Sequence, residues 1–341
     1  MPLANFIVVG ENIHCTRIVK SGGRKTVTLP DGTEAVAFKY QGEERTLPVP
    51  PDWSNVSPAY NDGKIKHVAL AMHHIFNAAD DSTKQAGIDY LCYTAERQIN
   101  AGATFLDVNV DEYSNIPEKQ AEAMEFLAGF LSSRYDTPLS IDSSNPATLE
   151  AGLKQCRTGG QPPMINSISL ERPELADLAS EYDADVIVNA SGRDGMPCQV
   201  DDRLANFREI IGALTARGIA HSKLHLDPLV FPISTDPMNG QYVLQTNRKA
   251  AQEFEGVHLN GGLSNISFGM PNRKLLNMVF VFLCAESGTD GGIIDPVVTP
   301  VKAIAEMDVH TESFKLASAV LTGEDMFGME YITAHREGRL G

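Results

Sequence analysis

The amino-acid sequence predicts an α/β fold of the (β/α)8 TIM-barrel class, with an inserted hairpin and loop region after the first strand. Eight short apolar runs alternate with helical patterns at a spacing of roughly 30 residues, which is typical of successive strand–helix units. The first strand ends without the glycine-rich fingerprint of an open doubly wound sheet. The expected strands cover residues 6–10, 104–108, 138–141, 164–168, 186–188, 223–226, 258–263 and 291–294.

Helical patterns occupy the intervals between these runs. A helix is expected to begin at Ser82 and to stop at Gly102, and apolar positions at helical spacing predict another over residues 117–131. Pro146 stands where a first-turn proline belongs, directly after a capping Asn145. Further helices are expected from Pro173, over residues 201–216, from Pro271 and from Pro300, the last of them including residues 308–310.

We expect one barrel domain over residues 1–341, in which residues 20–80 interrupt the strand–helix rhythm. Two β-rich runs flank Pro30-Asp31-Gly32-Thr33, which predicts a hairpin. A proline-rich stretch and the only tryptophan, Trp53, follow it. An insertion after the first strand of a barrel belongs on the face that carries the active site. It is either a decorative hairpin or dimer contact, or a lid or docking surface for a partner.

Composition excludes several classes of protein. The formal net charge of -16 argues against general nucleic-acid binding, which requires a basic surface. The longest apolar run falls short of the roughly 20 residues that span a bilayer, and the N-terminus lacks the features of a signal peptide. Five scattered cysteines indicate reduced thiols and a cytoplasmic protein: Cys15, Cys92, Cys156, Cys198 and Cys284.

Carboxylate and amide side chains stand at the ends of several expected strands, where the small-molecule site of a barrel lies. These strand ends contain no lysine or arginine, so they favour a polar, mostly uncharged heterocycle over a phosphate. The segments are Phe105-Leu106-Asp107-Val108-Asn109, Leu139-Ser140-Ile141-Asp142-Ser143-Ser144-Asn145, Met164-Ile165-Asn166-Ser167, His225-Leu226-Asp227-Pro228-Leu229 and Leu263-Ser264-Asn265-Ile266-Ser267.

These segments, together with Gly10-Glu11-Asn12-Ile13 before them and Asn272-Arg273 and Asn277 after them, occur in an order that resembles the pterin-binding methyltetrahydrofolate:corrinoid protein methyltransferases. The folate domain of cobalamin-dependent methionine synthase is related to that family. The resemblance covers about residues 5–12 and 83–320 and implies a single pterin-binding TIM-barrel domain. It also implies methyl transfer between N5 of tetrahydrofolate and the cobalt of a corrinoid (cobalamin) carried on a separate protein, and a homodimer.

By this resemblance, Asp107, Asn145 and Asp227 hydrogen-bond the pterin ring. The carboxylates accept from its amino and N–H groups. Asn265 lies near N5 and is the expected catalytic residue, because its amide can stabilise N5–H as charge changes. Further contacts are expected from Glu11, Asn109, Asn166, Ser267 and Arg273. Considered one at a time, without the order of the motifs, these residues are equally consistent with helix caps, turn residues and surface ion pairs.

The sequence departs from the family pattern in three places. Phe268 stands where the family often has Gln, Asp111 stands where Gly is common, and the insertion after the first strand is longer. These departures leave open the partner and the direction of transfer. The upstream methyl donor is likewise open.

No metal site is expected in this chain. The spacing of His73-His74, and of His14 with Cys15, fits no common zinc motif. Asp308-Val309-His310 resembles the start of a corrinoid-binding signature, but Ser313 replaces its glycine, so the corrinoid is expected on another protein.

Two alternatives remain open. A dihydropteroate synthase-like pterin enzyme is disfavoured, because Gly292-Ile293-Ile294-Asp295-Pro296 replaces the basic end that such an enzyme has after its eighth strand. A non-catalytic pterin-binding module would bind folate without transferring a methyl group. Loss of transfer in an Asn265→Ala variant that still binds folate separates methyltransferase from module.

Overall fold

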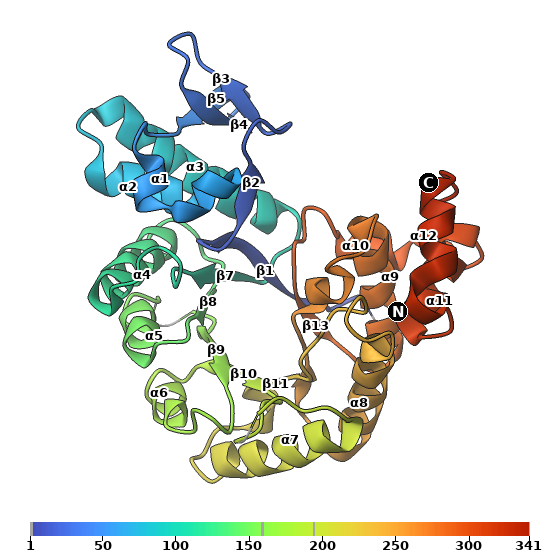
Figure 1. Cartoon of the computed structure of the whole chain (residues 1–341). Helices are drawn as coiled ribbons and strands as arrows, with labels where there is room; N and C mark the ends of the chain where they lie inside the picture. Colours follow the sequence, from blue (N-terminus) through green and yellow to red (C-terminus); the bar gives the residue numbers. More distant parts are fainter. Residues whose placement is uncertain (1–2, 158–159, 194, 341) are drawn as a thin grey trace. The chain divides into compact units, whose positions relative to one another are not determined.

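The computed structural model describes residues 3–157, 160–193 and 195–340. Its main sheet has eight strands in the order β12-β11-β10-β9-β8-β7-β1-β13. The strands, shown in Figure 1, are β1 (Ile7–His14), β7 (Phe105–Asn109), β8 (Leu139–Asp142), β9 (Met164–Ile168), β10 (Asp185–Asn189), β11 (Leu224–Asp227), β12 (His258–Leu259) and β13 (Gly291–Ile294). This is the predicted (β/α)8 class, in a nearly closed barrel.

Backbone hydrogen bonds join the two strands at the ends of that order. Asp290 N donates to Leu259 O at 3.2 Å, and Ile293 N donates to Gly261 O at 2.9 Å. β1 pairs in parallel with β13, from Ile7 beside Gly291 to Gly10 beside Ile294. Parallel pairing also joins β9 to β10, β10 to β11 and β7 to β8. Because parallel strands need long crossovers, helices alternate with them along the chain.

Helices follow the strands in the predicted rhythm. They are α3 (Asp81–Asn100), α4 (Pro117–Ser132), α5 (Pro146–Leu153), α6 (Leu175–Glu181), α7 (Val200–Thr215), α8 (Asn239–Glu253), α9 (Arg273–Glu286), α10 (Val301–Ala305), α11 (Glu312–Thr322) and α12 (Met329–Arg336). Short 3-10 turns are η2 (His221–Lys223), η3 (Leu263–Ser267) and η4 (Met326–Gly328). Figure 1 shows α7 and α8 outside β10 and β11. None of the described helices combines the length and hydrophobicity that crossing a bilayer requires.

The chain divides into two compact units: Met1–Gly10, Ala101–Phe105 and Thr158–Gly341 in the first, and Glu11–Asn100 and Leu106–Arg157 in the second. The single domain over residues 1–341 remains a prediction. In the first unit, buried apolar side chains from five strands form a hydrophobic core cluster: Val9, Phe105, Met164, Ile187 and Ile293. β-branched and aromatic residues of this kind are favoured on a pleated, buried surface.

The insertion forms a small structure of its own in the second unit. Its elements are β2 (Ile18–Lys20), β3 (Thr26–Thr28), β4 (Glu34–Tyr40), β5 (Glu43–Pro48), α1 (Trp53–Val56), η1 (Pro58–Asp62), β6 (Lys64–Lys66) and α2 (His67–Asn77). The predicted hairpin is present as β3 and β4, and β5 adds an unexpected third antiparallel strand. Phe38 of β4 packs edge-on against Tyr90 of α3, with ring centroids 4.9 Å apart. Aromatic packing therefore fixes the hairpin on α3.

The structure differs from the predicted elements at several places. β1 continues past Gly10 to His14, and α8 was not predicted. The run at 258–263 forms only the two residues of β12, because Gly261 and Gly262 turn the chain and Leu263 already opens η3. Residues 308–310 lie in a turn between α10 and α11 instead of within a helix. There Asp308 Oδ1 accepts from His310 N at 2.9 Å, and an aspartate of this kind favours a turn over a helix interior.

Candidate active site

Asp107, His14 and Asp142 form a cluster in the second unit, which we call the His–Asp–Asp cluster. They come from three strands, β7, β1 and β8. His14 Nε2 lies 2.7 Å from Asp107 Oδ2, and one potential ligand atom from each of the three residues lies within 4.8 Å of the others. Asp107 is fully buried. Two carboxylates and an imidazole at this spacing can share protons, accept N–H donors or hold a divalent cation.

Burial and mutual charge control the protonation of this cluster. Burial, followed by the negative charge of Asp107, raises the pKa of Asp142 to about 7. Burial alone would lower the pKa of His14, but the hydrogen bond and the charge of Asp107 outweigh it, so the pKa of His14 is raised. The cluster therefore changes its proton content near neutral pH.

Asn109 and Asp111 connect the loops that follow β7 and β8. Asn109 Nδ2 donates to Asp142 Oδ2 at 3.0 Å, while its Oδ1 accepts from Asp111 N at 3.0 Å. Asp111 in turn accepts from the Ser143 hydroxyl at 2.5 Å and from Ser144 N at 2.8 Å. The aspartate that departs from the family pattern thus fixes the loop after β8. Asn109, predicted as a more distant contact or a contact to the tail of the folate, orients Asp142 through its amide.

Asn145 caps helix α5. Its side-chain Oδ1 accepts a hydrogen bond from Ala147 N at 2.9 Å, as the sequence predicted for the residue before Pro146. Since the oxygen is occupied by the cap, the amide NH2 group is what Asn145 has to offer a ligand. Glu11, also predicted as a contact, forms an ion pair with Arg17 at 2.7 Å.

Asp227 and Asn265 form a second group, in the first unit. Asp227 is the last residue of β11, and its Oδ1 accepts from Leu229 N at 2.8 Å. Burial raises the pKa of Asp227 to about 6, although the backbone N–H groups of Leu229 and Gly262 and the charge of Arg203 oppose the rise. Asp227 is therefore an ionised but incompletely compensated carboxylate at neutral pH.

Two consecutive glycines bring the backbone against both side chains of this group. A Cβ atom on Gly261 would lie 3.1 Å from Asp227 Oδ1, and one on Gly262 would lie 3.0 Å from Asn265 Nδ2. Asp227 and Asn265 therefore approach the same short stretch of chain, which explains the Gly-Gly pair as close packing. Asn265 is half-buried in η3, and within the described part of the chain its side-chain amide has no hydrogen-bond partner.

Arg273 and Ser267 hold η3 in place. Arg273 Nε donates to Ser267 Oγ at 3.0 Å and its terminal nitrogen donates to Ser264 O at 3.1 Å. The guanidinium also lies 4.2 Å from the ring centroid of Phe268, the aromatic residue that replaces the family's Gln. These contacts fix the conformation of the turn that carries Asn265. Asn166, the remaining predicted contact, is the middle residue of β9.

Sequence reasoning missed His14, Asp142 and Arg203 as site residues. Asp142 belongs to the same motif as Asn145, and His14 directly follows Gly10-Glu11-Asn12-Ile13, so both stood beside recognised signals. Arg203 of α7 is buried and donates to Pro228 O at 2.7 Å, next to Asp227. Nothing local in the sequence places Arg203 there, because it lies 24 residues before Asp227.

Replacing Arg203 with Met should destabilise the protein by about 2–4 kcal/mol, since Pro228 O loses a charged, buried donor. The pKa of Asp227 should rise further, because the Arg203 charge lowers it. Urea unfolding measures the first effect. Arg193→Met, which removes an exposed ion pair with Glu209, is the matched control and should leave the midpoint unchanged. Equal urea midpoints for the two variants would show that the buried Arg203 contact does not stabilise the protein.

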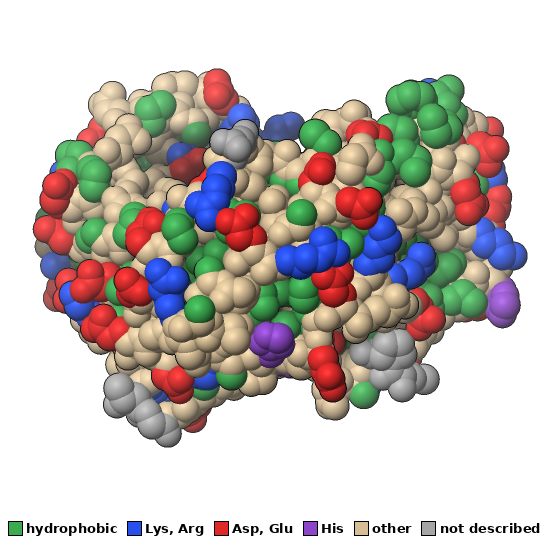
Figure 2. All heavy atoms as spheres, turned by 90° about the horizontal axis from the view of Figure 1, so that it is seen from below, with side chains coloured by type: hydrophobic (Ala, Val, Ile, Leu, Met, Phe, Trp, Pro, Cys, Tyr) green, Lys and Arg blue, Asp and Glu red, His purple; other side chains and the backbone are tan. Residues whose placement is uncertain are grey.

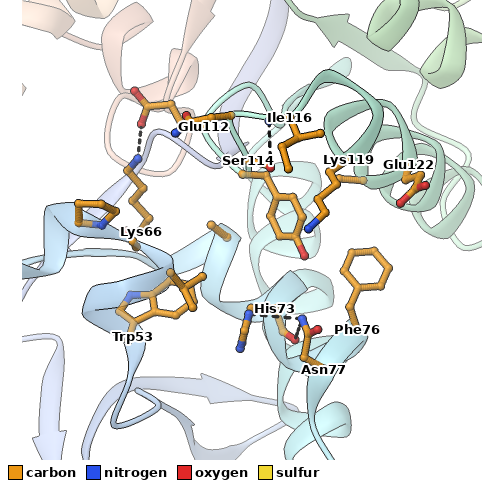
Figure 3. A pocket seen from close by; sticks show the side chains of 17 residues that line it. Trp53, Lys66, His73, Phe76, Asn77, Glu112, Ser114, Ile116, Lys119 and Glu122 are labelled. Carbon is orange, nitrogen blue, oxygen red and sulfur yellow. Dashed lines mark hydrogen bonds and ion pairs between the residues drawn. The ribbon is translucent and has the colours of Figure 1, made fainter.

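A cavity of about 680 Å³ lies elsewhere in the second unit, beside the insertion. Figure 3 shows Trp53, Lys66, His73 and Phe76 of the insertion on one side of it, and Glu112 to Glu122 on the other. Lys66 and Glu112 form an ion pair at 3.0 Å across its edge. Residues 112–116 follow the carboxyl end of β7, so the insertion contacts the loop at that end of the strand. None of the predicted site residues lines this cavity.

Charged side chains of both signs share one face of the molecule. On the face drawn in Figure 2, acidic and basic side chains are interspersed, and many of the basic ones have acidic neighbours. Exposed pairs such as Arg217 with Asp177 and Lys249 with Asp201 have this character. The cysteines are free thiols, three of them buried.

Acid and amide side chains stand at the carboxyl ends of the barrel strands in both units. The sequence matches the family described as pterin binding enzyme over residues 73–295. The chain belongs to this family of pterin-binding enzymes.

Curated relatives and solved structures agree with this placement. The chain is 28% identical over 254 residues to a methylcorrinoid:tetrahydrofolate methyltransferase of Eubacterium limosum, covering 72% of this chain and 86% of the relative. It is 30% identical over 228 residues to methionine synthase of Mycobacterium leprae, covering 62% of this chain and only 18% of that longer protein. A Yersinia pestis DHPS structure with a pterine-sulfa conjugate superposes with a TM-score of 0.52 at 22% identity, covering 64% and 87% of the two chains. At that identity the superposition shows the fold alone.

Proposed function

We propose that this protein is a methyltransferase that moves a methyl group between N5 of tetrahydrofolate and the cobalt of a corrinoid on a separate protein. The observation that carries the proposal is the half-buried amide of Asn265, which lies against Gly262, next to the glycine that Asp227 approaches, and is without a hydrogen-bond partner in the described chain. The similarity to a methylcorrinoid:tetrahydrofolate methyltransferase supports the same reaction. Homodimer formation and a cytoplasmic location remain predictions.

The donors and acceptors fit a pterin ring. Asp107 and Asp142 in the second unit and Asp227 in the first are buried or half-buried carboxylates, and a carboxylate is suited to accept N–H groups such as those of a pterin ring. Their negative charge disfavours a pyrophosphate-bearing pterin. The residue after β13 is also acidic: Asp295 Oδ1 accepts from Val297 N at 3.0 Å. A dihydropteroate synthase would need basic ligands for its anionic substrate at this position, so the methyltransferase is favoured.

Breaking the N5–methyl bond requires protein groups that act on N5. The departing nitrogen is a poor leaving group as an anion, so it must be protonated or strongly hydrogen-bonded by the transition state. An amide does not titrate near neutrality, but Asn265 can donate through Nδ2 or accept through Oδ1 as the charge on N5 changes. Arg273 and Ser267 keep its turn in position. The corrinoid, carried by its partner, supplies the cobalt that exchanges the methyl group.

Two substrate pairs offered in parallel test the reaction class. The purified protein is incubated anaerobically with 5-methyltetrahydrofolate and Co(I) cobalamin, and separately with a dihydropterin pyrophosphate and 4-aminobenzoate. Mass spectrometry then identifies the folate products. We expect tetrahydrofolate in the first mixture and no dihydropteroate in the second. Dihydropteroate formation would replace the proposal by a synthase, whereas saturable folate binding without either product would indicate a non-catalytic module.

A further inference from the structure

The exposed apolar side chains of the first unit gather at one end of its strands. Among the residues that the structure describes there, every exposed large hydrophobic residue follows the carboxyl end of a strand or belongs to a segment that packs beside such a loop. They are Met196 after β10, Phe268 after β12, Val298 after β13, and Met326, Phe327 and Met329 in η4 and at the start of α12. Single exposed apolar residues are normally scattered over a surface, so their restriction to one end indicates an interaction surface.

The segment formed by η4 and the start of α12 lies against the chain that follows η3. A Cβ atom on Gly328 would lie 2.8 Å from the terminal methyl carbon of Met270. Tyr331 Oη, in α12, donates to Asn272 O at 3.3 Å. Met270 and Asn272 come shortly after η3, the turn that carries Asn265. The exposed apolar residues of η4 are therefore continuous with the turn of the proposed catalytic amide.

Phe327 projects from a preorganised turn. Its φ of 59° lies in the left-handed region, which is unfavourable for a bulky side chain, and the residue is 69% exposed. Asp325, which is buried, fixes the turn: its Oδ1 accepts from Glu330 N at 3.1 Å and its Oδ2 accepts from Tyr331 N at 2.9 Å. Neither the backbone conformation nor the exposure of Phe327 stabilises the folded chain. Both are explained if Phe327 contacts another molecule.

The size and place of this surface favour a transient partner over a second copy of the chain. Met326, Phe327 and Met329 together expose an area on the order of a few hundred Å². A stable complex buries roughly 800 Å² on each partner. A second copy seated permanently on this surface would also cover the turn of Asn265, where the proposed methyl exchange takes place. The corrinoid protein must reach that turn, and the methyl groups at the edge of a corrin ring suit polarisable Met and Phe side chains.

We propose that Phe268 and residues 326–329 form the docking surface for the corrinoid protein. This inference rests on the proposed function. Phe268 directly follows η3, and the Arg273 guanidinium, 4.2 Å from the centroid of its ring, holds it in place. Residues 326–329 lie outside residues 73–295, over which the chain matches its family. The choice of corrinoid partner is therefore made in part by a segment that the family match does not include.

The double variant Phe327→Asn, Met329→Gln removes the apolar groups and preserves the backbone, because asparagine tolerates the left-handed conformation and glutamine is a good helix former. The methyl acceptors are free Co(I) cobalamin and, separately, a Co(I) corrinoid protein that the wild-type protein methylates. We expect the KM for the corrinoid protein to rise about 10–100-fold. The rate at saturating corrinoid protein and the rate with free cobalamin should stay within about twofold of wild type, because neither side chain belongs to the proposed folate site.

Val27→Thr is the matched control, because Val27 is an exposed apolar residue of β3 in the second unit, and its removal should leave the KM for the corrinoid protein unchanged. A wild-type KM in the double variant would overturn the inference. An equal loss of rate with free cobalamin would show that the substitutions disturb the folate site instead of docking. A dimeric wild type that becomes monomeric in the double variant, with the KM unchanged, would assign the surface to a second copy.

Failure of this inference can be told from failure of the proposed function. Transfer to free cobalamin, but to none of the corrinoid proteins offered, would overturn the docking surface and leave the methyl-transfer chemistry standing. Absence of transfer to either kind of acceptor would remove the proposed function together with this inference.

Discussion

Replacing Asn265 with alanine is expected to lower the rate of methyl transfer by about 10²–10³-fold, the usual cost of removing one donor aimed at a developing charge. Affinity for folate should change little, because the proposed role of Asn265 is to act on N5 in the transition state and other residues would bind the ring. The structural reason is that the Asn265 amide, half-buried in η3, forms no hydrogen bond within the described chain. Single-turnover transfer rates, with folate affinity measured in parallel, separate the two effects.

Asn55→Ala is the matched control for that variant. Asn55 is exposed on α1 and outside the site, so its removal should leave both rate and affinity unchanged. Wild-type transfer by Asn265→Ala would show that the catalytic assignment is wrong. A parallel loss of affinity and rate would make Asn265 a binding residue instead of one that acts in the transition state.

Asp227→Asn is expected to stabilise the protein while weakening folate binding. Burial raises the pKa of Asp227 from 3.8 to about 6, so the native state binds this proton more tightly than the unfolded chain does. Wild-type stability therefore falls as the pH rises from about 4 to about 6, by about 3 kcal/mol in total, and stays lower above it. Asparagine does not titrate and still accepts from Leu229 N. The free energy of unfolding of Asp227→Asn, measured in urea, should therefore increasingly exceed that of the wild type as the pH rises over that range, and the difference should then level off.

The same substitution removes a charge-assisted acceptor, which should weaken folate binding about 10–100-fold. Asp177→Asn, at an exposed residue of α6, is the control and should change neither quantity. Lower stability of Asp227→Asn at pH 7 would contradict the claim that the buried charge is incompletely compensated. Unchanged affinity would remove Asp227 from the pterin site.

The eight strands could be predicted because each contains a short run with apolar residues, as in Asp185–Asn189, where Val186, Ile187 and Val188 are β-branched. Helix α8 could not be located, because its buried face is partly polar. Asn247 of that helix is buried and donates to Thr289 Oγ1 at 2.7 Å, a partner 42 residues away. A hydrophobic pattern does not reveal a face that is satisfied by a tertiary hydrogen bond.

The candidate site likewise contains residues that the sequence could predict and residues that it could not. The family resemblance implied Asp107, Asp227 and Asn265, whose motifs stand at the ends of strands, but the pattern could not tell a ligand contact from a helix cap at Asn145. His14 was passed over because the first strand was expected to end at Gly10. β1 continues to His14 through polar residues, and a strand that lines a polar site does not keep an apolar sequence.

The measurement that tests the central claim most directly is anaerobic spectroscopy of cobalt during a single turnover. The protein, loaded with 5-methyltetrahydrofolate, is mixed with Co(I) cobalamin or with a Co(I) corrinoid protein, and the absorbance is followed with time. We predict loss of the Co(I) spectrum, gain of methyl–Co(III) and one tetrahydrofolate formed per methyl group transferred. A folate-saturated protein that leaves the spectrum of free cobalamin and of the corrinoid protein alike unchanged would contradict the account.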